Sequence, residues 1–134
     1  MDIEKKIVEY FSNMSHIAAV YLFGSAIRVG FELAEDIDIA VLFETEGIPD
    51  GFRRIEMQEN LSDYLKKEVD LVVLNSAPVI LRYQVLKKGK LLILKNRKVK
   101  NEFFVSTLNQ YFDLKQIRMP IEKKLVKVNL FGRF

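Results

Sequence analysis

Two short motifs, separated by ten residues, carry residue types on which chemistry could be built. Gly24-Ser25 is followed by Asp36-Ile37-Asp38. A glycine lets the backbone approach a ligand closely, and the free N–H groups of a helix start after the turn favour phosphate. Alternate residues of a strand share a face, so the two carboxylates project together, and Mg²⁺ would relieve their repulsion. The motifs together predict phosphate and metal chemistry of the nucleotidyl-transfer type.

Both motifs adjoin apolar runs of strand length. The run 17–23 ends at Gly24, and the run 37–43 begins among the acids. A third run, 69–74, places Asp70 near its start. If this strand lies beside the Asp-x-Asp strand, three carboxylates meet at one edge of the sheet, which suits a two-metal site. The alternative reading of Asp70, as a capping acid after the preceding helix, is equally open.

The elements that must position these residues alternate along the chain. Ser25 is expected to cap a short helix, and Pro120 is expected to end the last helix. The helix within 50–67 is expected to use Phe52, Ile55, Leu61, Tyr64 and Leu65 as its apolar face. Further helices are expected at about 3–14, 78–88 and 100–118, with a strand at 90–94. This pattern predicts an α/β (α+β) domain, a mixed β-sheet packed with helices.

With these motifs the chain resembles the DNA polymerase β-type nucleotidyltransferase superfamily, whose signature is Gly-Ser, a spacer, Asp-x-Asp and a later Asp. Within it, the chain is similar to the minimal nucleotidyltransferases (MNT) that are paired with HEPN-domain toxins. The segment VDLVVLNSAPVILRYQVLKKGKLLI also resembles that group. Many relatives read Gly-Ser-Arg-Ala-Arg-Gly, whereas this chain has GSAIRV, which keeps Arg28 but has Ala26 and Val29. These departures concern substrate preference more than activity.

The resemblance implies a nucleotidyltransferase fold and an antitoxin that moves AMP from ATP onto a tyrosine hydroxyl of a HEPN ribonuclease toxin. Gly24, Ser25 and Arg28 would bind the nucleotide. Asp36, Asp38 and Asp70 would be the catalytic residues and the ligands of Mg²⁺, with two ions expected. The cognate HEPN toxin and ATP are the implied partners.

The length and composition of the chain limit its number of domains, its disulfides and its location. The 134 residues predict a single domain, 1–134, with a core large enough to need no disulfide, and the chain has no cysteine. A cytoplasmic location is expected because the start lacks a signal peptide and no apolar run approaches a membrane span. His16, the only histidine, is expected to be solvated or capping, so histidine metal sites are not expected.

Charge is divided along the chain. Residues 1–70 carry 15 of the 18 acids, and residues 71–134 carry 14 of the 21 bases. Such a basic run is most often a solvated face, and direct nucleic-acid binding is not expected although it stays open. The tail 119–134 combines apolar residues with a net charge of +3 and is interpreted as a partner-docking segment, with back-packing on the sheet as the alternative.

Two other functions stay open from the sequence. One is a transferase that acts on a small hydroxyl compound or an RNA end, although such enzymes usually append a substrate domain. The other is a non-catalytic antitoxin that neutralises its partner by binding alone.

Overall fold

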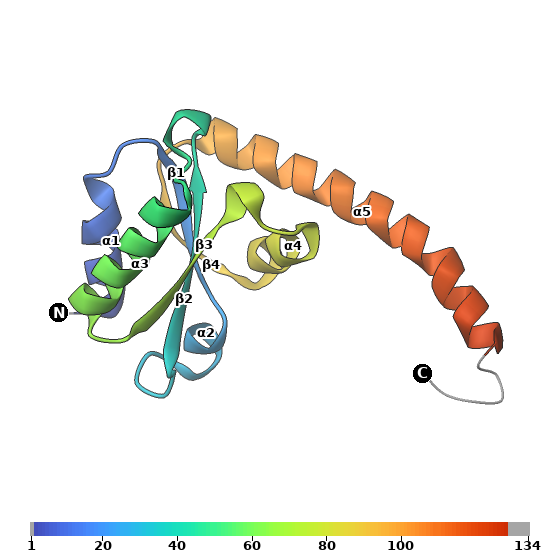
Figure 1. Cartoon of the computed structure of the whole chain (residues 1–134), viewed down its shortest axis with the longest axis horizontal. Coiled ribbons are helices and arrows are strands. Elements are labelled where there is room, and N and C mark those ends of the chain that lie inside the picture. Colours follow the sequence, from blue (N-terminus) through green and yellow to red (C-terminus); the bar gives the residue numbers. More distant parts are fainter. Residues whose placement is uncertain (1, 129–134) are drawn as a thin grey trace.

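A four-stranded sheet with helices on both faces forms the body of the protein (Figure 1). The computed structural model describes the backbone of residues 2–128 and the side chains of residues 2–116. The strand order is β3-β2-β1-β4. The strands are β1 (Ile17–Phe23), β2 (Asp36–Phe43), β3 (Glu68–Val73) and β4 (Lys90–Leu94). β1 is antiparallel to both of its neighbours, whereas β2 and β3 are parallel, so the expected mixed sheet is confirmed.

The helices follow the expected alternation. They are α1 (Ile3–Ser12), α2 (Ser25–Val29), α3 (Gly51–Leu65), α4 (Val79–Lys88) and α5 (Arg97–Val128), with 3-10 turns η1 (Thr45–Gly47) and η2 (Leu74–Ser76). Asp2 and Asp50 cap α1 and α3 by accepting hydrogen bonds from the backbone N–H groups of Glu4 and Arg53. No helix in the described part of the chain combines the length and apolar character that a membrane crossing would need.

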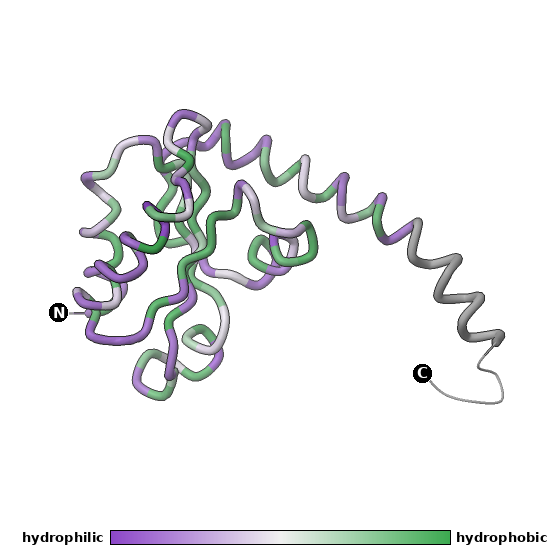
Figure 2. Tube along the Cα trace, viewed as in Figure 1, coloured by the Kyte–Doolittle hydropathy of each residue, from purple (hydrophilic) through white to green (hydrophobic). Residues whose placement is uncertain are grey.

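The core is divided by the sheet into two layers. One layer lies under α1 and α3 and includes Ile7, Phe11, Ile39 and Leu61. The other lies under α4 and the first turns of α5 and is built on small and apolar residues such as Ala19, Ala40 and Val85. β1 and β2 are buried along nearly their whole length, as strands covered on both faces are. In Figure 2 most of the trace of these central strands has the colour of hydrophobic residues.

The expected apolar face of α3 was partly wrong. Met57, Leu61 and Leu65 are its buried residues, at a spacing of four. Phe52 is 89% exposed, and Ile55 and Tyr64 are also exposed, because the helix presents the Met57-Leu61-Leu65 stripe to the sheet.

The last helix is longer than expected. α5 runs for 32 residues through Pro120 to Val128, so Pro120 does not end it. A proline removes one backbone hydrogen bond from a helix, and the residues after it, including Ile121, Glu122 and Leu125, are compatible with continuing the helix. Figure 1 shows α5 passing α4 and projecting away from the sheet. Part of the tail 119–134 is therefore helical, and residues 129–134 lie outside the described residues.

Candidate active site

The turn after β1 and the start of β2 lie against each other. Phe23 pairs with Asp38 across the antiparallel strands, and Gly24 follows Phe23 directly. Gly24 has φ 78° and ψ −151°, a region of backbone conformation that is essentially restricted to glycine. A Cβ atom added there would overlap the Oδ2 atom of Asp38 and lie 3.0 Å from its Cγ. The absence of a side chain at Gly24 therefore makes room for the Asp38 carboxylate.

Parallel pairing of β2 with β3 brings the acids together. Asp38 pairs with Asp70, and Asp36 pairs with Glu68. Asp36 and Asp38 are two residues apart, so all four side chains project from the same face of the sheet. The two strands are neighbours, which is the condition on which a site of three carboxylates depended. Glu68 is an acid of this edge that the sequence reasoning missed, and only the strand register could have revealed it.

The pKa of Asp38 responds to its burial and to the neighbouring carboxylates. Burial raises the pKa of Asp38 above the ordinary carboxyl value, and the negative charges of Asp70 and Asp36 raise it further. A carboxyl whose pKa rises on folding stabilises the fold only while it is protonated. That contribution is complete below the ordinary carboxyl pKa and is lost as the pH rises through the raised value. At neutral pH the ionised Asp38 therefore destabilises the metal-free protein, which is the condition that a bound cation would relieve.

The turn differs in one detail from the expectation. Gly24, and not Ser25, is the N-cap residue of α2, and no side chain caps this helix; Ser25 is its first residue. Because Gly24 has a positive φ, it lies outside the helix, and α2 begins at Ser25. Arg28 lies in the last turn of the short helix and is exposed. Arg82, a basic residue of α4, donates a hydrogen bond to the Oε1 atom of Gln110 on α5 at 2.9 Å.

Side chains of α3 fix the strand that carries Asp70. β3 lies at an edge of the sheet, so its outer backbone groups have no neighbouring strand. The N–H of Val69 donates to Ser62 Oγ at 3.0 Å, and the N–H of Leu71 donates to Gln58 Oε1 at 2.8 Å. Because these two bonds bracket Asp70, they fix its backbone next to Asp38. Sequence reasoning missed Gln58 and Ser62, whose role depends on the packing of α3 against an edge strand.

Lys67 fixes the loop that joins the two motifs. Its Nζ atom donates to the carbonyl oxygen of Ala34 at 2.9 Å and also to that of Phe31. These carbonyls belong to the segment between α2 and Asp36. Lys67 thus ties the turn before β3 to the loop before β2, and both of these strands carry acids of the site.

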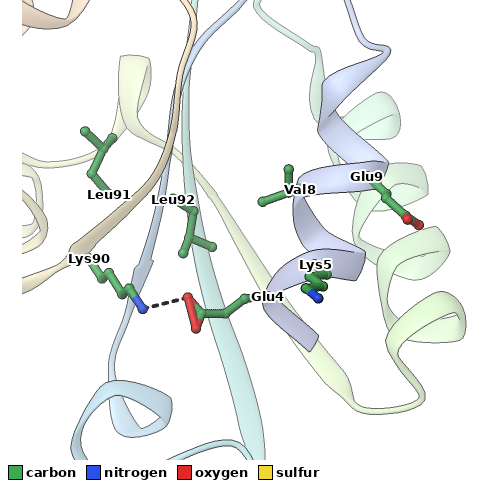
Figure 3. A pocket seen from close by; sticks show the side chains of 7 residues that line it. All are labelled: Glu4, Lys5, Val8, Glu9, Lys90, Leu91 and Leu92. Atoms are coloured by element: carbon green, nitrogen blue, oxygen red, sulfur yellow. Dashed lines mark hydrogen bonds and ion pairs between the residues drawn. The ribbon is translucent and has the colours of Figure 1, made fainter. Parts of the chain in front are cut away.

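A surface pocket lies away from these acids, between α1 and β4 (Figure 3). Its polar side chains include an exposed ion pair in which Lys90 Nζ lies 2.7 Å from Glu4 Oε1. Leu91, Leu92 and Val8 supply apolar walls. None of the predicted site residues lines this pocket, so it does not contribute to the site on β2 and β3.

Known proteins are similar to this chain in sequence and in fold. Residues 5–98 match the family described as Polymerase beta, Nucleotidyltransferase. The chain is 35% identical over 120 residues to the protein adenylyltransferase MntA of Shewanella oneidensis, which covers 88% of this chain and 84% of that relative.

Two solved structures are similar over nearly the same length. One is a crystal structure of a toxin-antitoxin with AMP-PNP, with TM-score 0.75, 33% identity, and coverage of 92% of this chain and 98% of that chain. The other contains a tri-AMPylated Shewanella oneidensis HEPN toxin in complex with MNT antitoxin, with TM-score 0.73, 33% identity, and coverage of 92% and 96%. The resemblance drawn from the sequence motifs is confirmed: the chain belongs to the polymerase β-type nucleotidyltransferase family.

Proposed function

We propose that this protein is a Mg²⁺-dependent adenylyltransferase antitoxin that transfers AMP from ATP to a tyrosine hydroxyl of a cognate HEPN toxin. One observation carries the proposal: Asp38 lies between Gly24 and Asp70 in a chain similar along 92% of its length to an MNT antitoxin in complex with an AMPylated toxin. The similar structure with AMP-PNP supports ATP as the donor. The tri-AMPylated toxin in the other similar structure supports a protein as the acceptor. A cytoplasmic location is part of the same proposal.

The acids of β2 and β3 suit Mg²⁺. The ion prefers oxygen ligands, and the pKa of Asp38 is raised first by burial and then by the negative charges of Asp70 and Asp36. Asp36, Asp38 and Asp70 are the proposed ligands, for two ions. When bound, the metal would neutralise these carboxylates and the phosphates and lower the pKa of the attacking hydroxyl.

Residues of the chain would bind the nucleotide and help to remove the proton of the acceptor. The backbone at Gly24 and Ser25 would bind the terminal phosphates, and Arg28 would add a positive charge beside them. A free tyrosine has a pKa near 10, so Asp70 is proposed to help remove the proton of the attacking hydroxyl. The tyrosine oxygen then forms a bond to the α-phosphorus as the bond to the bridging oxygen breaks, and pyrophosphate leaves.

The tail 119–134 is proposed to dock the toxin. The fully buried Thr107 and the packed Phe103 lie in the first part of α5, so the packing of this helix against the body begins well before the tail. The tail combines apolar residues with a net charge of +3, a composition that suits a docking segment for a second protein.

The test is to incubate the protein with ATP, Mg²⁺ and the cognate HEPN protein and to measure the intact mass of both. The proposal expects the HEPN protein to gain one or more AMP units only when ATP and Mg²⁺ are present, and its ribonuclease activity to fall in parallel. Inhibition without any gain in mass would instead support neutralisation by binding alone. AMP on an RNA end or a small hydroxyl compound, with the HEPN protein unchanged, would also overturn the proposal.

A further inference from the structure

A second group of potential metal ligands lies at the opposite end of the central strands. His16 immediately precedes β1, Glu44 immediately follows β2, and Glu46 belongs to η1. Ile17 pairs with Phe43 at this end, whereas Phe23 pairs with Asp38 at the other. The separation is six residues along β1, or about 20 Å at the rise of a β-strand. This group is therefore distinct from the acids of the active site.

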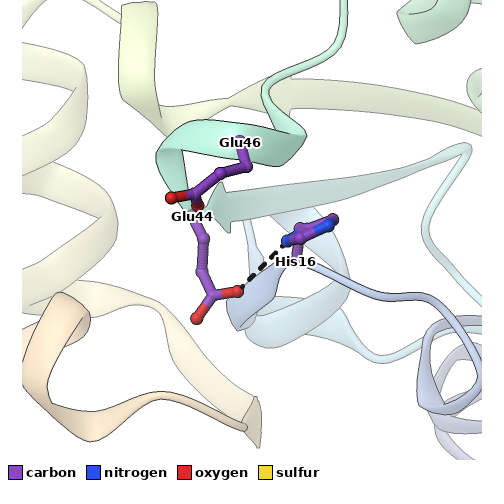
Figure 4. Close-up of side chains that lie close together, drawn as sticks. All are labelled: His16, Glu44 and Glu46. Atoms are coloured by element: carbon purple, nitrogen blue, oxygen red, sulfur yellow. Dashed lines mark ion pairs between the residues drawn. The ribbon is translucent and has the colours of Figure 1, made fainter.

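The donor atoms of its three side chains lie near one another. One donor atom from each of the three side chains lies within 4.8 Å of the other two (Figure 4). His16 Nδ1 lies 3.5 Å from Glu44 Oε1. This distance is longer than an ordinary N–H···O hydrogen bond, which spans about 2.7–3.2 Å. It matches the separation of about 3.4 Å between two ligands that each lie about 2.1 Å from a tetrahedral ion.

The surrounding structure orients two of the ligands. Asn96 lies in the turn between β4 and α5, and its Nδ2 atom donates a hydrogen bond to Glu44 Oε2. The other carboxylate oxygen, Glu44 Oε1, faces His16. Hydrogen bonds of this kind to a ligating carboxylate are typical of the outer shell of metal sites. The backbone N–H of Glu44 donates to the carbonyl oxygen of His16 at 2.8 Å. His16 has φ 65°, a left-handed backbone conformation that is uncommon outside glycine.

We propose that His16, Glu44 and Glu46 form a Zn²⁺ site that is independent of the active site. An imidazole nitrogen with two carboxylates suits Zn²⁺, whereas Mg²⁺ and Ca²⁺ prefer ligand sets made of oxygen alone. Three protein ligands leave a fourth position for water. Through Asn96, the bound ion would fix the start of α5 to the end of the β1–β2 pair. The expectation from the sequence that the single histidine has no metal role is revised by this proposal.

Because His16 is the only histidine, its imidazole signals in an NMR spectrum of tag-free protein report on this group alone. Addition of Zn²⁺ is expected to shift these signals in a saturable way with one equivalent, and a large excess of Mg²⁺ is expected to leave them unchanged. Competition with a chromophoric chelator gives the affinity. Imidazole signals of the wild-type protein that stay unchanged on addition of Zn²⁺ would overturn the proposal.

Variants separate this site from the catalytic acids. His16→Asn removes the imidazole but tolerates the left-handed backbone, and Glu46→Gln removes a ligand from the exposed turn. Each is expected to weaken Zn²⁺ binding at least about tenfold, the lower end of the loss seen for outer-shell changes. Asp36→Asn/Asp38→Asn is the matched control, and the Zn²⁺-induced imidazole shift should persist in it. Unchanged affinity in both site variants, or loss of the shift in the control, would refute the assignment.

Discussion

Replacement of Gly24 by alanine tests whether this turn serves to make room for the Asp38 carboxylate. The new methyl group would overlap Asp38 Oδ2 and lie 3.0 Å from Cγ and 3.3 Å from Cβ. Relief of the overlap requires the carboxylate oxygen to move by more than about 1 Å, since ordinary van der Waals contact begins near 3.4 Å. A displacement of about 1 Å in a catalytic group can lower the rate about 100-fold. We therefore expect kcat for AMP transfer to fall about 100-fold.

The same substitution also strains the backbone, and Gly30 offers a control for that effect. Gly30 has φ 83° and ψ 166°, close to the conformation of Gly24, but an added Cβ would meet no atom within 4 Å. Strain of this kind costs about 1–3 kcal/mol at either position. For a domain of this size, each kcal/mol lowers the Tm by about 3–5 °C. Gly24→Ala and Gly30→Ala should therefore lose similar thermal stability.

The assay is single-turnover transfer to the HEPN protein at saturating ATP and Mg²⁺, quenched and followed by intact mass, beside thermal unfolding of each variant. Transfer should be lost in Gly24→Ala and largely kept in Gly30→Ala. An equal loss in both variants would show that strain in the loop, and not the position of Asp38, limits the reaction. Near-normal transfer by a folded Gly24→Ala would refute the role given to this contact.

Three other predictions address separate parts of the molecule. Asp38→Asn should raise the Tm of the metal-free protein at pH 7, because it removes an ionised carboxyl whose pKa is raised by burial and by Asp70 and Asp36, and it should lower transfer about 100-fold or more. A lower metal-free Tm, measured in EDTA, would contradict this account. Gln58→Leu should cost about 1 kcal/mol in urea unfolding and slow transfer, because the N–H of Leu71 loses its acceptor, and full activity would show that Asp70 needs no such support. Deletion of residues 120–134 should leave the Tm and ATP binding nearly intact and weaken the toxin complex in a pull-down titration, whereas an unfolded product would show that the tail completes the core.

The strands were predictable because their apolar runs have clear ends. All four begin and end within one residue of the expected ranges. The pairing of Asp38 with Asp70 was only conditional from sequence, since a register depends on contacts between segments 32 residues apart. The same limit concealed Glu68 and the approach of His16 to Glu44. Proline was given too much weight at Pro120, where the helix continues on both sides.

The edges of the sheet decide from which side another protein can approach the acids. On β3, side chains of α3 occupy the backbone groups that would otherwise accept an added strand. Growth of the sheet beside Asp70 is therefore blocked, and self-association through this edge is disfavoured. The opposite edge, β4, is tied to α1 at both ends: Lys90 pairs with Glu4, and Lys95 Nζ donates to the carbonyl oxygens of Phe11 and Met14. The acceptor hydroxyl of the proposed reaction is therefore expected to reach the acids without adding a strand to β3.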